Sequence, residues 1–297
     1  MRVLVSGSSG LIGRALVREL RDAGVDAVRL VRASQTEAGA VRWDPALRGF
    51  DAGAAEGADA VVHLAGENIA SRRWSDDQKG RIRGSRVDGT AFLSDRLAAL
   101  ERPPRVFVGA SAVGFYGDTG DREVDESAGP GTDFLAKVCR DWEEASGPLR
   151  ERGVRVVCLR IGVVLSGAGG ALARMLPLFR LGLGGRVGSG GQWMSWIAID
   201  DLTGVIRFAL ENARLVGPVN AVAPEPVRNA EFTKALARVL GRPAFVPAPA
   251  FALRLALGEM ADALLLSSSR VVPSVLGREG FSFRHPNVEQ ALRSVLG

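Results

Sequence analysis

Three glycines at positions 7, 10 and 13 form the strongest chemical signal in the chain. They lie in Gly7-Ser-Ser-Gly10-Leu-Ile-Gly13, directly after a β-type run and at the start of a helix-type segment. In this context Gly7 permits a tight turn, Gly10 lets the backbone approach a pyrophosphate, and Gly13 allows close packing of helix on strand. The helix N-terminus adds free N–H groups and a favourable dipole. The pattern predicts a dinucleotide site that includes Gly7, Gly10, Leu11, Ile12 and Gly13.

The tip of the second β-type run indicates which dinucleotide is bound. An acidic residue there accepts hydrogen bonds from the ribose 2′-OH, whereas an arginine accommodates a 2′-phosphate. The run ends in Arg29-Leu-Val-Arg32 with no acid at its tip, and Asp26 stands at its beginning. We therefore expect NADP(H) rather than NAD(H), with Arg32 at the 2′-phosphate. The alternative for Arg32 is a solvated loop cation.

Short β-type runs that alternate with helix-type segments must position these residues. Strands are expected near Val3–Ser6, Ala27–Val31, Ala60–Leu64, Val106–Ala110 and Val154–Ile161. Helices are expected over Leu11–Ala23, Asp76–Leu100 and Phe134–Arg152. The runs at Ala60 and Val106 are continuously apolar, as in strands that helices cover on both faces. The pattern predicts an α/β fold with a Rossmann-type, doubly wound parallel sheet.

The character of the chain changes after Leu165. A stretch from Leu181 to Gly191 contains six glycines, which implies flexibility or close backbone approach. A helix over Asn229–Leu240 is expected to start at an Asn cap, and Asn287–Leu296 reads as a last helix. We predict that 1–165 form the NADP-binding domain and that 197–223 return to it. Segments 166–196 and 224–297 would form a smaller, mainly helical substrate lobe.

Composition argues against several classes of partner. The 297 residues include 38 Lys and Arg against 33 Asp and Glu, and the arginines are scattered singly, which disfavours nucleic-acid binding. Two cysteines without a CxxC spacing and two histidines in unrelated segments predict no metal site and a reducing compartment. We find no secretory leader and no apolar run of about 18 residues. We therefore expect a cytoplasmic protein without membrane partners.

Taken together, the motifs resemble those of the extended short-chain dehydrogenase/reductases. The closer resemblance is to their atypical, epimerase-like branch, labelled nucleoside-diphosphate-sugar epimerase and sometimes cell-division-inhibitor-like. It covers nearly the whole chain and is carried by Ser6–Gly13, Val62–Asn68, Gly84–Thr90, Ser111–Gly117, Ser195–Asp201 and Gly280–Pro286.

The resemblance assigns further residues to the cofactor. It implies that Leu64, Ala65 and Gly66 lie against the adenosine and pyrophosphate, in agreement with the switch-point rule for open sheets. It also implies that Val164 lines the nicotinamide side. Arg86 stands where the superfamily usually carries an Asn, so its guanidinium is expected to point at the cofactor or its phosphates. The alternative for Arg86 is a surface ion pair.

The main departure concerns catalysis. Typical members use a Tyr-x-x-x-Lys pair, in which the Lys lowers the pKa of the tyrosine for proton transfer. At the expected position this chain has Asp133-Phe-Leu-Ala-Lys137, and we expect Lys137 to be a surface residue. The resemblance implies that Ser111, at the end of the fifth strand, binds a substrate carbonyl. Tyr116, the single tyrosine of the chain, could take the acid role, or it could pack in a turn with its hydroxyl bonded to backbone or water.

Two functions remain open from the sequence. The first is an NADP(H)-dependent oxidoreductase or epimerase-like protein that acts on an unidentified small polar substrate. The second is a non-catalytic NADP(H)-binding redox sensor or regulatory protein, which the missing tyrosine favours. The resemblance also allows a homodimer through the helices that begin at Asp76 and Phe134.

Overall fold

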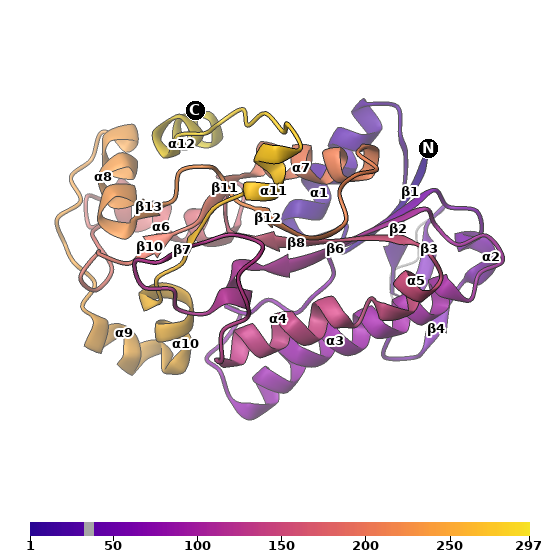
Figure 1. The fold of residues 1–297 in the computed structure, drawn as a ribbon. Helices are drawn as coiled ribbons and strands as arrows, with labels where there is room; N and C mark the ends of the chain where they lie inside the picture. The colour runs from indigo at the N-terminus through magenta and orange to yellow at the C-terminus, as the bar shows by residue number, and fades with distance from the viewer. Residues whose placement is uncertain (33–38) are drawn as a thin grey trace.

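A sheet of eight strands forms the centre of the computed structural model, which describes residues 1–32 and 39–297 (Figure 1). The strand order is β12-β8-β6-β5-β1-β2-β3-β4, and every neighbouring pair is parallel except β3 with β4. The strands are β1 (Arg2–Ser6), β2 (Asp26–Val31), β3 (Val41–Asp44), β4 (Gly49–Phe50), β5 (Ala60–His63), β6 (Val106–Ala112), β8 (Arg155–Ile161) and β12 (Gly217–Ala221).

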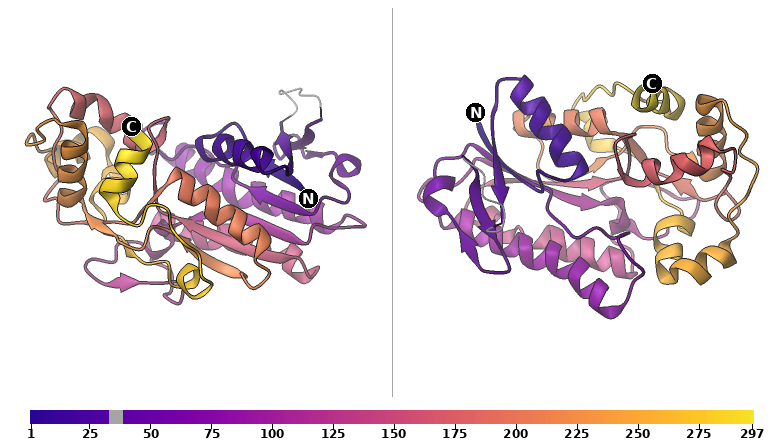
Figure 2. Two further views of the ribbon diagram at one scale, coloured as in Figure 1. Left: turned by 90° about the horizontal axis from the view of Figure 1, so that it is seen from above. Right: turned by 180° about the vertical axis from the view of Figure 1, so that it is seen from behind.

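Helices cover both faces of this sheet, which confirms the predicted doubly wound fold (Figures 1 and 2). Val3 and Val5 of β1 pack in one apolar core with α1 and α7, whereas Leu4 packs in a second core with α3 and α5. The alternation of the two cores along one strand follows from the two-residue period of β structure. The helices are α1 (Leu11–Asp22), α2 (Ala52–Ala55), α3 (Asp76–Ala98), α4 (Phe134–Glu144), α5 (Gly147–Glu151) and α7 (Ile199–Glu211).

The chain changes direction across the sheet at β1. From β1 it continues to β2 on one side, and β5 pairs with the other side of β1. The helices that follow β1 and β5, α1 and α3, pack in the two different cores on opposite faces of the sheet. In open α/β sheets a ligand crevice is expected at such a switch point, beyond the carboxyl ends of the two strands. The glycine loop and the Leu64–Gly66 segment both begin at this switch point.

Local sequence explains where the main helices begin. The buried residues of α1, Gly13, Leu16, Val17 and Leu20, recur at helical spacing. The side chain of Ser75 accepts a hydrogen bond from the N–H of Gln78 and caps α3, and Asp133 caps α4 in the same way through Ala136.

Three details differ from the sequence-based expectations. Strands β3 and β4 were not predicted, because they are short and lie at the edge of the sheet. The expected helix Phe134–Arg152 is divided into α4 and α5, since Pro148 lacks an N–H donor for a continuous helix. Asn229 does not cap its helix: Arg228 is the capping residue, and the Asn229 side chain accepts the N–H of Val187 instead.

A smaller lobe, mainly helical, packs at the carboxyl end of the sheet (Figure 1). Its core joins Leu172 and Phe179 of α6 to Trp196 of β11, Phe232 of α8 and Leu292 of α12. Helix α9 in this region has no buried residue. The remaining elements are η1 (Val113–Tyr116), β7 (Glu123–Val124), β9 (Val163–Leu165), α6 (Gly170–Arg180), β10 (Trp193–Met194), β11 (Trp196–Ala198), β13 (Val227–Arg228), α8 (Asn229–Leu240), α9 (Ala250–Leu257), α10 (Glu259–Ala261), η2 (Asp262–Leu266), β14 (Arg270–Val271), α11 (Ser274–Arg278) and α12 (Val288–Leu296).

Candidate functional site

The glycine loop connects β1 to α1 with almost no space for side chains. Gly7 has a φ of 64°, and a Cβ there would lie 2.7 Å from the carbonyl carbon of Leu64. A Cβ at Gly13 would lie 2.2 Å from the carbonyl oxygen of Gly7. Gly10 is less constrained, since its Cβ would stay 3.2 Å from the same oxygen. The loop therefore requires glycine most strictly at Gly7 and Gly13.

The first turn of α1 faces the loop that precedes α6. No side chain caps the helix at Gly10. Leu11 contacts Gly169 and Gly170, where an added Cβ would lie 3.2 Å from Leu11 side-chain atoms. Ile12 and Val164 are half-buried and pack against the α1–α7 core. Segments from the sheet and from the smaller lobe thus meet around the start of α1.

Two arginines belong to the region of β2, one inside the strand and one directly after it. Arg29 Nε donates a hydrogen bond of 2.9 Å to the hydroxyl of Ser8, which ties β2 to the loop. Arg32 directly follows β2 and is exposed. An exposed guanidinium at the carboxyl end of β2 is where a 2′-phosphate would be recognised.

Arg86 lies against Gly66. Its Nη1 donates to the carbonyl oxygens of Glu67 and Ile82 at 3.0 and 3.3 Å. The guanidinium carbon is 5.1 Å from the ring centre of Trp142, and it would be 3.3 Å from a Cβ on Gly66. Burial lowers the pKa of Arg86, but a guanidinium stays charged in a protein at neutral pH. A cation is therefore fixed at the end of β5.

Ser111 is buried at the carboxyl end of β6 and is bonded to an acidic residue of α4. Its hydroxyl donates to Glu143 Oε1 at 2.7 Å. The same carboxylate receives two hydrogen bonds from Arg160 of β8, from Nε at 2.8 Å and from Nη2 at 2.9 Å. Ser111, Arg160 and Asn220 are paired residues on β6, β8 and β12, so their side chains form one row across the sheet.

Tyr116 joins this row from η1. Its hydroxyl accepts a hydrogen bond from Arg160 Nη1 at 2.9 Å and donates one of 2.7 Å to Asn220 Oδ1. Burial raises the pKa of Tyr116, although the charge of Arg160 acts in the opposite direction. The predicted turn position of Tyr116 is correct, but its partners are side chains rather than backbone or water.

The face of α4 that meets η1 carries Leu135 and Cys139. A Cβ on Gly114 would lie 3.5 Å from Leu135 Cβ and 4.0 Å from Cys139 Sγ. Burial, with the Glu143 charge acting in the same direction, raises the pKa of Cys139 to about 12. Lys137 is exposed, as expected for a surface residue, and Asp133 serves as the helix cap. This face of α4 thus offers no readily exchangeable proton at neutral pH.

Flexibility and close backbone approach were the two explanations for the glycine-rich stretch 181–191. The structure shows close approach. A Cβ on Gly185 would lie 1.9 Å from the carbonyl oxygen of Val246, and one on Gly184 would lie 2.6 Å from the Phe179 ring. Trp196 is fully buried, whereas the ring of Trp193 has the guanidinium carbons of Arg228 and Arg270 within 4.6 and 4.7 Å of its centre.

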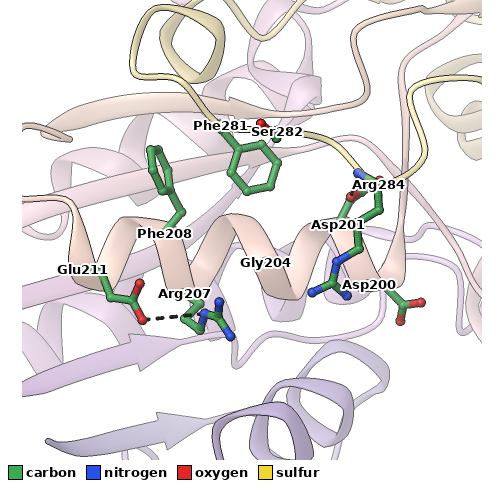
Figure 3. A pocket seen from close by; sticks show the side chains of 9 residues that line it. All are labelled: Asp200, Asp201, Gly204, Arg207, Phe208, Glu211, Phe281, Ser282 and Arg284. Carbon is green, nitrogen blue, oxygen red and sulfur yellow. Dashed lines mark hydrogen bonds and ion pairs between the residues drawn. The ribbon is translucent and has the colours of Figure 1, made fainter. Parts of the chain in front are cut away.

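Two hollows in the described surface lie apart from the predicted site residues. One, of about 170 Å³, is lined by α7 and the C-terminal segment (Figure 3), and the other lies beside β7. In the first, the buried carboxylate of Asp201 accepts the N–H groups of Arg284 and His285 at 2.7 and 3.0 Å. Asp201 therefore anchors the C-terminal segment to α7.

Sequence reasoning did not identify Glu143, Arg160 or Asn220. The available signal was a charged residue, Arg160, within the apolar run Val156–Ile161, because a buried charge requires a partner. His63 of β5 is fully buried. Within the described ranges, no group of three or more potential ligand side chains is arranged to hold a metal ion. No helix in them has the length and apolar composition needed to cross a membrane.

Comparison with known proteins agrees with the fold and the glycine loop. The sequence pattern of the "NAD dependent epimerase/dehydratase family" matches residues 3–222, and a domain of unknown function, DUF1731, matches residues 248–295. An epimerase family protein of Mycobacterium bovis is 48% identical over 290 residues, which cover 98% of this chain and 96% of that protein.

Two crystal structures have similar chains. The human epimerase family protein SDR39U1, solved with NADPH, shares 35% identity at a TM-score of 0.91, and the match covers 99% of both chains. A nucleoside-diphosphate sugar epimerase from Corynebacterium glutamicum shares 41% identity at a TM-score of 0.82, over all of this chain and 58% of that chain. This protein therefore belongs to the NAD dependent epimerase/dehydratase family.

Proposed function

We propose that this protein binds NADP(H) in the crevice between the glycine loop and the Leu64–Gly66 segment. The observation that carries the proposal is the contact of Gly7 with the Leu64 peptide at the switch point of the sheet, because it leaves backbone rather than side chains facing the crevice. The human relative solved with NADPH supports the same cofactor.

Each predicted residue has a role in this proposal. Leu11, Ile12 and the glycines present the N-terminus of α1 to the pyrophosphate. Arg32 binds the 2′-phosphate, and Arg86 places its cation beside Gly66 at the cofactor. Val164 lines the nicotinamide side. Residues 1–165 with 197–223 form the cofactor domain, and 166–196 with 224–297 form the substrate lobe.

The reaction we propose is oxidoreduction or epimerisation of a small polar substrate. When bound, the nicotinamide ring of the cofactor would supply hydride transfer. The chain itself would orient the substrate between Ser111 and the glycine-rich stretch from Leu181 to Gly191. Ser111 and Tyr116 would act mainly by holding the strand ends in place, since both hydroxyls are already bonded to protein side chains.

A non-catalytic NADP(H) sensor is the second candidate. The observation that favours it is the α4 face with Leu135 and Cys139, which lacks a proton donor suited to neutral pH. A sensor would require a partner whose affinity differs between the NADP⁺ and NADPH forms.

A turnover experiment separates the two candidates. Purified protein with NADPH is incubated with pooled carbonyl compounds and pooled sugar nucleotides, and oxidation is followed at 340 nm while epimerisation is followed by chromatography. Product formation in any pool supports the enzyme. Tight NADPH binding without product in every pool would contradict it and favour the sensor.

Two further proposals concern the setting of the protein. Cys139 and Cys158 are both free and buried, which suits a reducing compartment and supports a cytoplasmic location. Helices α3 and α4 lie side by side on one face of the sheet, so a homodimer through them is proposed as well (Figure 1). A solution mass by light scattering tests the dimer. We propose no nucleic-acid partner.

A further inference from the structure

Ser6 and His63 lie side by side at the ends of β1 and β5, directly beneath the proposed cofactor site. They are paired residues in the sheet register, and both are fully buried. The Ser6 hydroxyl oxygen is 2.6 Å from His63 Nδ1. The same oxygen accepts hydrogen bonds from the backbone N–H groups of Leu64 and Ala65, at 3.1 and 3.3 Å. One hydroxyl therefore contacts a side chain and two successive backbone amides.

The direction of these hydrogen bonds follows from counting donors and acceptors. A serine hydroxyl has one proton and two acceptor sites. The N–H groups of Leu64 and Ala65 occupy both acceptor sites, so the Ser6 proton must be donated to His63 Nδ1. His63 is then the neutral tautomer with its proton on Nε2. In the described part of the chain, that Nε2 has no hydrogen-bond partner.

The two peptides held by Ser6 are in contact with the glycine loop. A Cβ on Gly7 would lie 2.7 Å from the carbonyl carbon of Leu64 and 2.8 Å from the nitrogen of Ala65. A displacement of the Leu64–Ala65 peptide would therefore change the space in which Gly7 turns. Ser6 also directly precedes Gly7, so one side chain constrains both walls of the crevice.

We infer that Ser6 and His63 form a positioning pair that fixes the two backbone walls of the dinucleotide site before the cofactor arrives. This inference rests on the proposed NADP(H) site. His63 orients the Ser6 hydroxyl, and Ser6 orders the Ala65 amide; neither side chain touches the cofactor. A site fixed in advance binds more tightly because less conformational entropy is lost on binding.

The primary test is titration of Ser6→Ala and His63→Phe with NADPH and with 2′-phospho-ADP-ribose, which lacks the nicotinamide. We expect both variants to bind both probes about tenfold more weakly, the effect of roughly one lost hydrogen bond. The double variant should be no weaker than Ser6→Ala alone, because the two residues act as one unit.

Ser94→Ala is the matched control. Ser94 is a fully buried serine of α3 whose hydroxyl has no hydrogen-bond partner in the described residues, so its removal deletes the same group without affecting the crevice. Its NADPH affinity should equal that of the wild type. His63→Phe keeps an aromatic ring between Trp43 and Phe107, so this variant preserves the test if Ser6→Ala does not fold.

Hydrogen exchange provides a readout that a general loss of stability would not move. Ala65 N–H has the Ser6 hydroxyl as its partner, whereas Leu64 N–H also bonds to the Ser6 carbonyl. The Ala65 amide should exchange faster in Ser6→Ala and stay protected in Ser94→Ala.

Each outcome has a defined meaning. If the wild type fails to bind NADPH, the proposed function itself is wrong. If the wild type binds and the folded Ser6 and His63 variants bind within twofold of it, the positioning pair is wrong while the cofactor site stands. Equal weakening in Ser94→Ala would also overturn the pair, because the effect would then come from lost packing.

Discussion

Arg160 and Glu143 form a two-point ion pair inside the protein, with Nε–Oε1 and Nη2–Oε2 distances of 2.8 and 2.9 Å. Their side chains are 5% and 12% exposed. The Ser111 hydroxyl donates a hydrogen bond to Glu143, and the Tyr116 hydroxyl accepts one from Arg160. Two proposed site residues therefore depend on this ion pair.

Breaking the pair from one side should be strongly destabilising. Arg160→Leu leaves the Glu143 carboxylate buried without a counter-charge, and we expect a loss of about 3–5 kcal/mol in the free energy of unfolding. Urea denaturation measures it. Arg207→Leu is the control, because Arg207 is 42% exposed in its own ion pairs and should change stability little. Equal effects of the two substitutions would contradict the structural role of the pair.

His63 should make stability depend on pH. Burial lowers the pKa of His63 to about 4 from 6.5 in the unfolded chain, and its ring neighbours Trp43 and Phe107 are uncharged. The unfolded state therefore binds the proton more tightly, and the contribution of His63 is complete above pH 6.5 and is lost as the pH falls toward 4.

The His63 contribution can be isolated with a variant. Between pH 7 and pH 5 the loss should be roughly 2 kcal/mol, given about 1.36 kcal/mol per pKa unit. Urea denaturation of wild type and His63→Phe at both pH values measures it as a change in their stability difference. A difference that stays constant with pH would show that His63 does not titrate in this way.

The glycines of the first loop should tolerate substitution unequally. Gly13→Ala places a methyl group 2.2 Å from the Gly7 oxygen and should abolish NADPH binding, whereas Gly10→Ala, at 3.2 Å, should weaken it less. Gly80→Ala is the control, since that exposed helical position has nothing within 4 Å, and it should stabilise the protein by about 0.5–1 kcal/mol. Thermal melting and NADPH titration together test this order, and a Gly13→Ala protein with normal affinity would refute it.

The two thiols should be unreactive in the folded protein. Burial raises the pKa of Cys139 to about 12 and that of Cys158 to about 11, and the thiolate is the reactive form. A chromogenic disulfide reagent at pH 8 should detect no rapid thiol in native protein and both thiols in denaturant. Rapid labelling of Cys139 in the native state would show that the α4 face is open to solvent.

The fold was largely predictable because its signals are local. Apolar runs such as Ala60–His63, the helix that follows Gly10, and the glycine spacing each depend on neighbours in sequence. The edge strands β3 and β4 were missed because a two- to four-residue strand carries too short a pattern. The break between α4 and α5 was missed although Pro148 was visible in the sequence.

The buried polar row was not predictable because it depends on register between distant segments. Arg160 meets Glu143 from another element, and Asn220 reaches Tyr116 over 104 positions in the sequence. Likewise, Ser6 and His63 become neighbours only when β1 and β5 pair. The sequence pattern identifies such residues as unusual, but the structure is needed to identify their partners.

Cofactor selectivity at Arg32 tests the central claim most directly. The affinities of wild type, Arg32→Ala and Arg18→Ala for NADPH and NADH are measured by calorimetric titration. Arg32→Ala removes a charge directly after β2, and Arg18→Ala removes an equal charge on the exposed side of α1. We predict that wild type prefers NADPH, that Arg32→Ala loses about tenfold or more of this preference, the effect of one strong phosphate contact, and that Arg18→Ala retains it. A wild type that binds neither dinucleotide, or an Arg32→Ala protein with unchanged preference, would contradict the account.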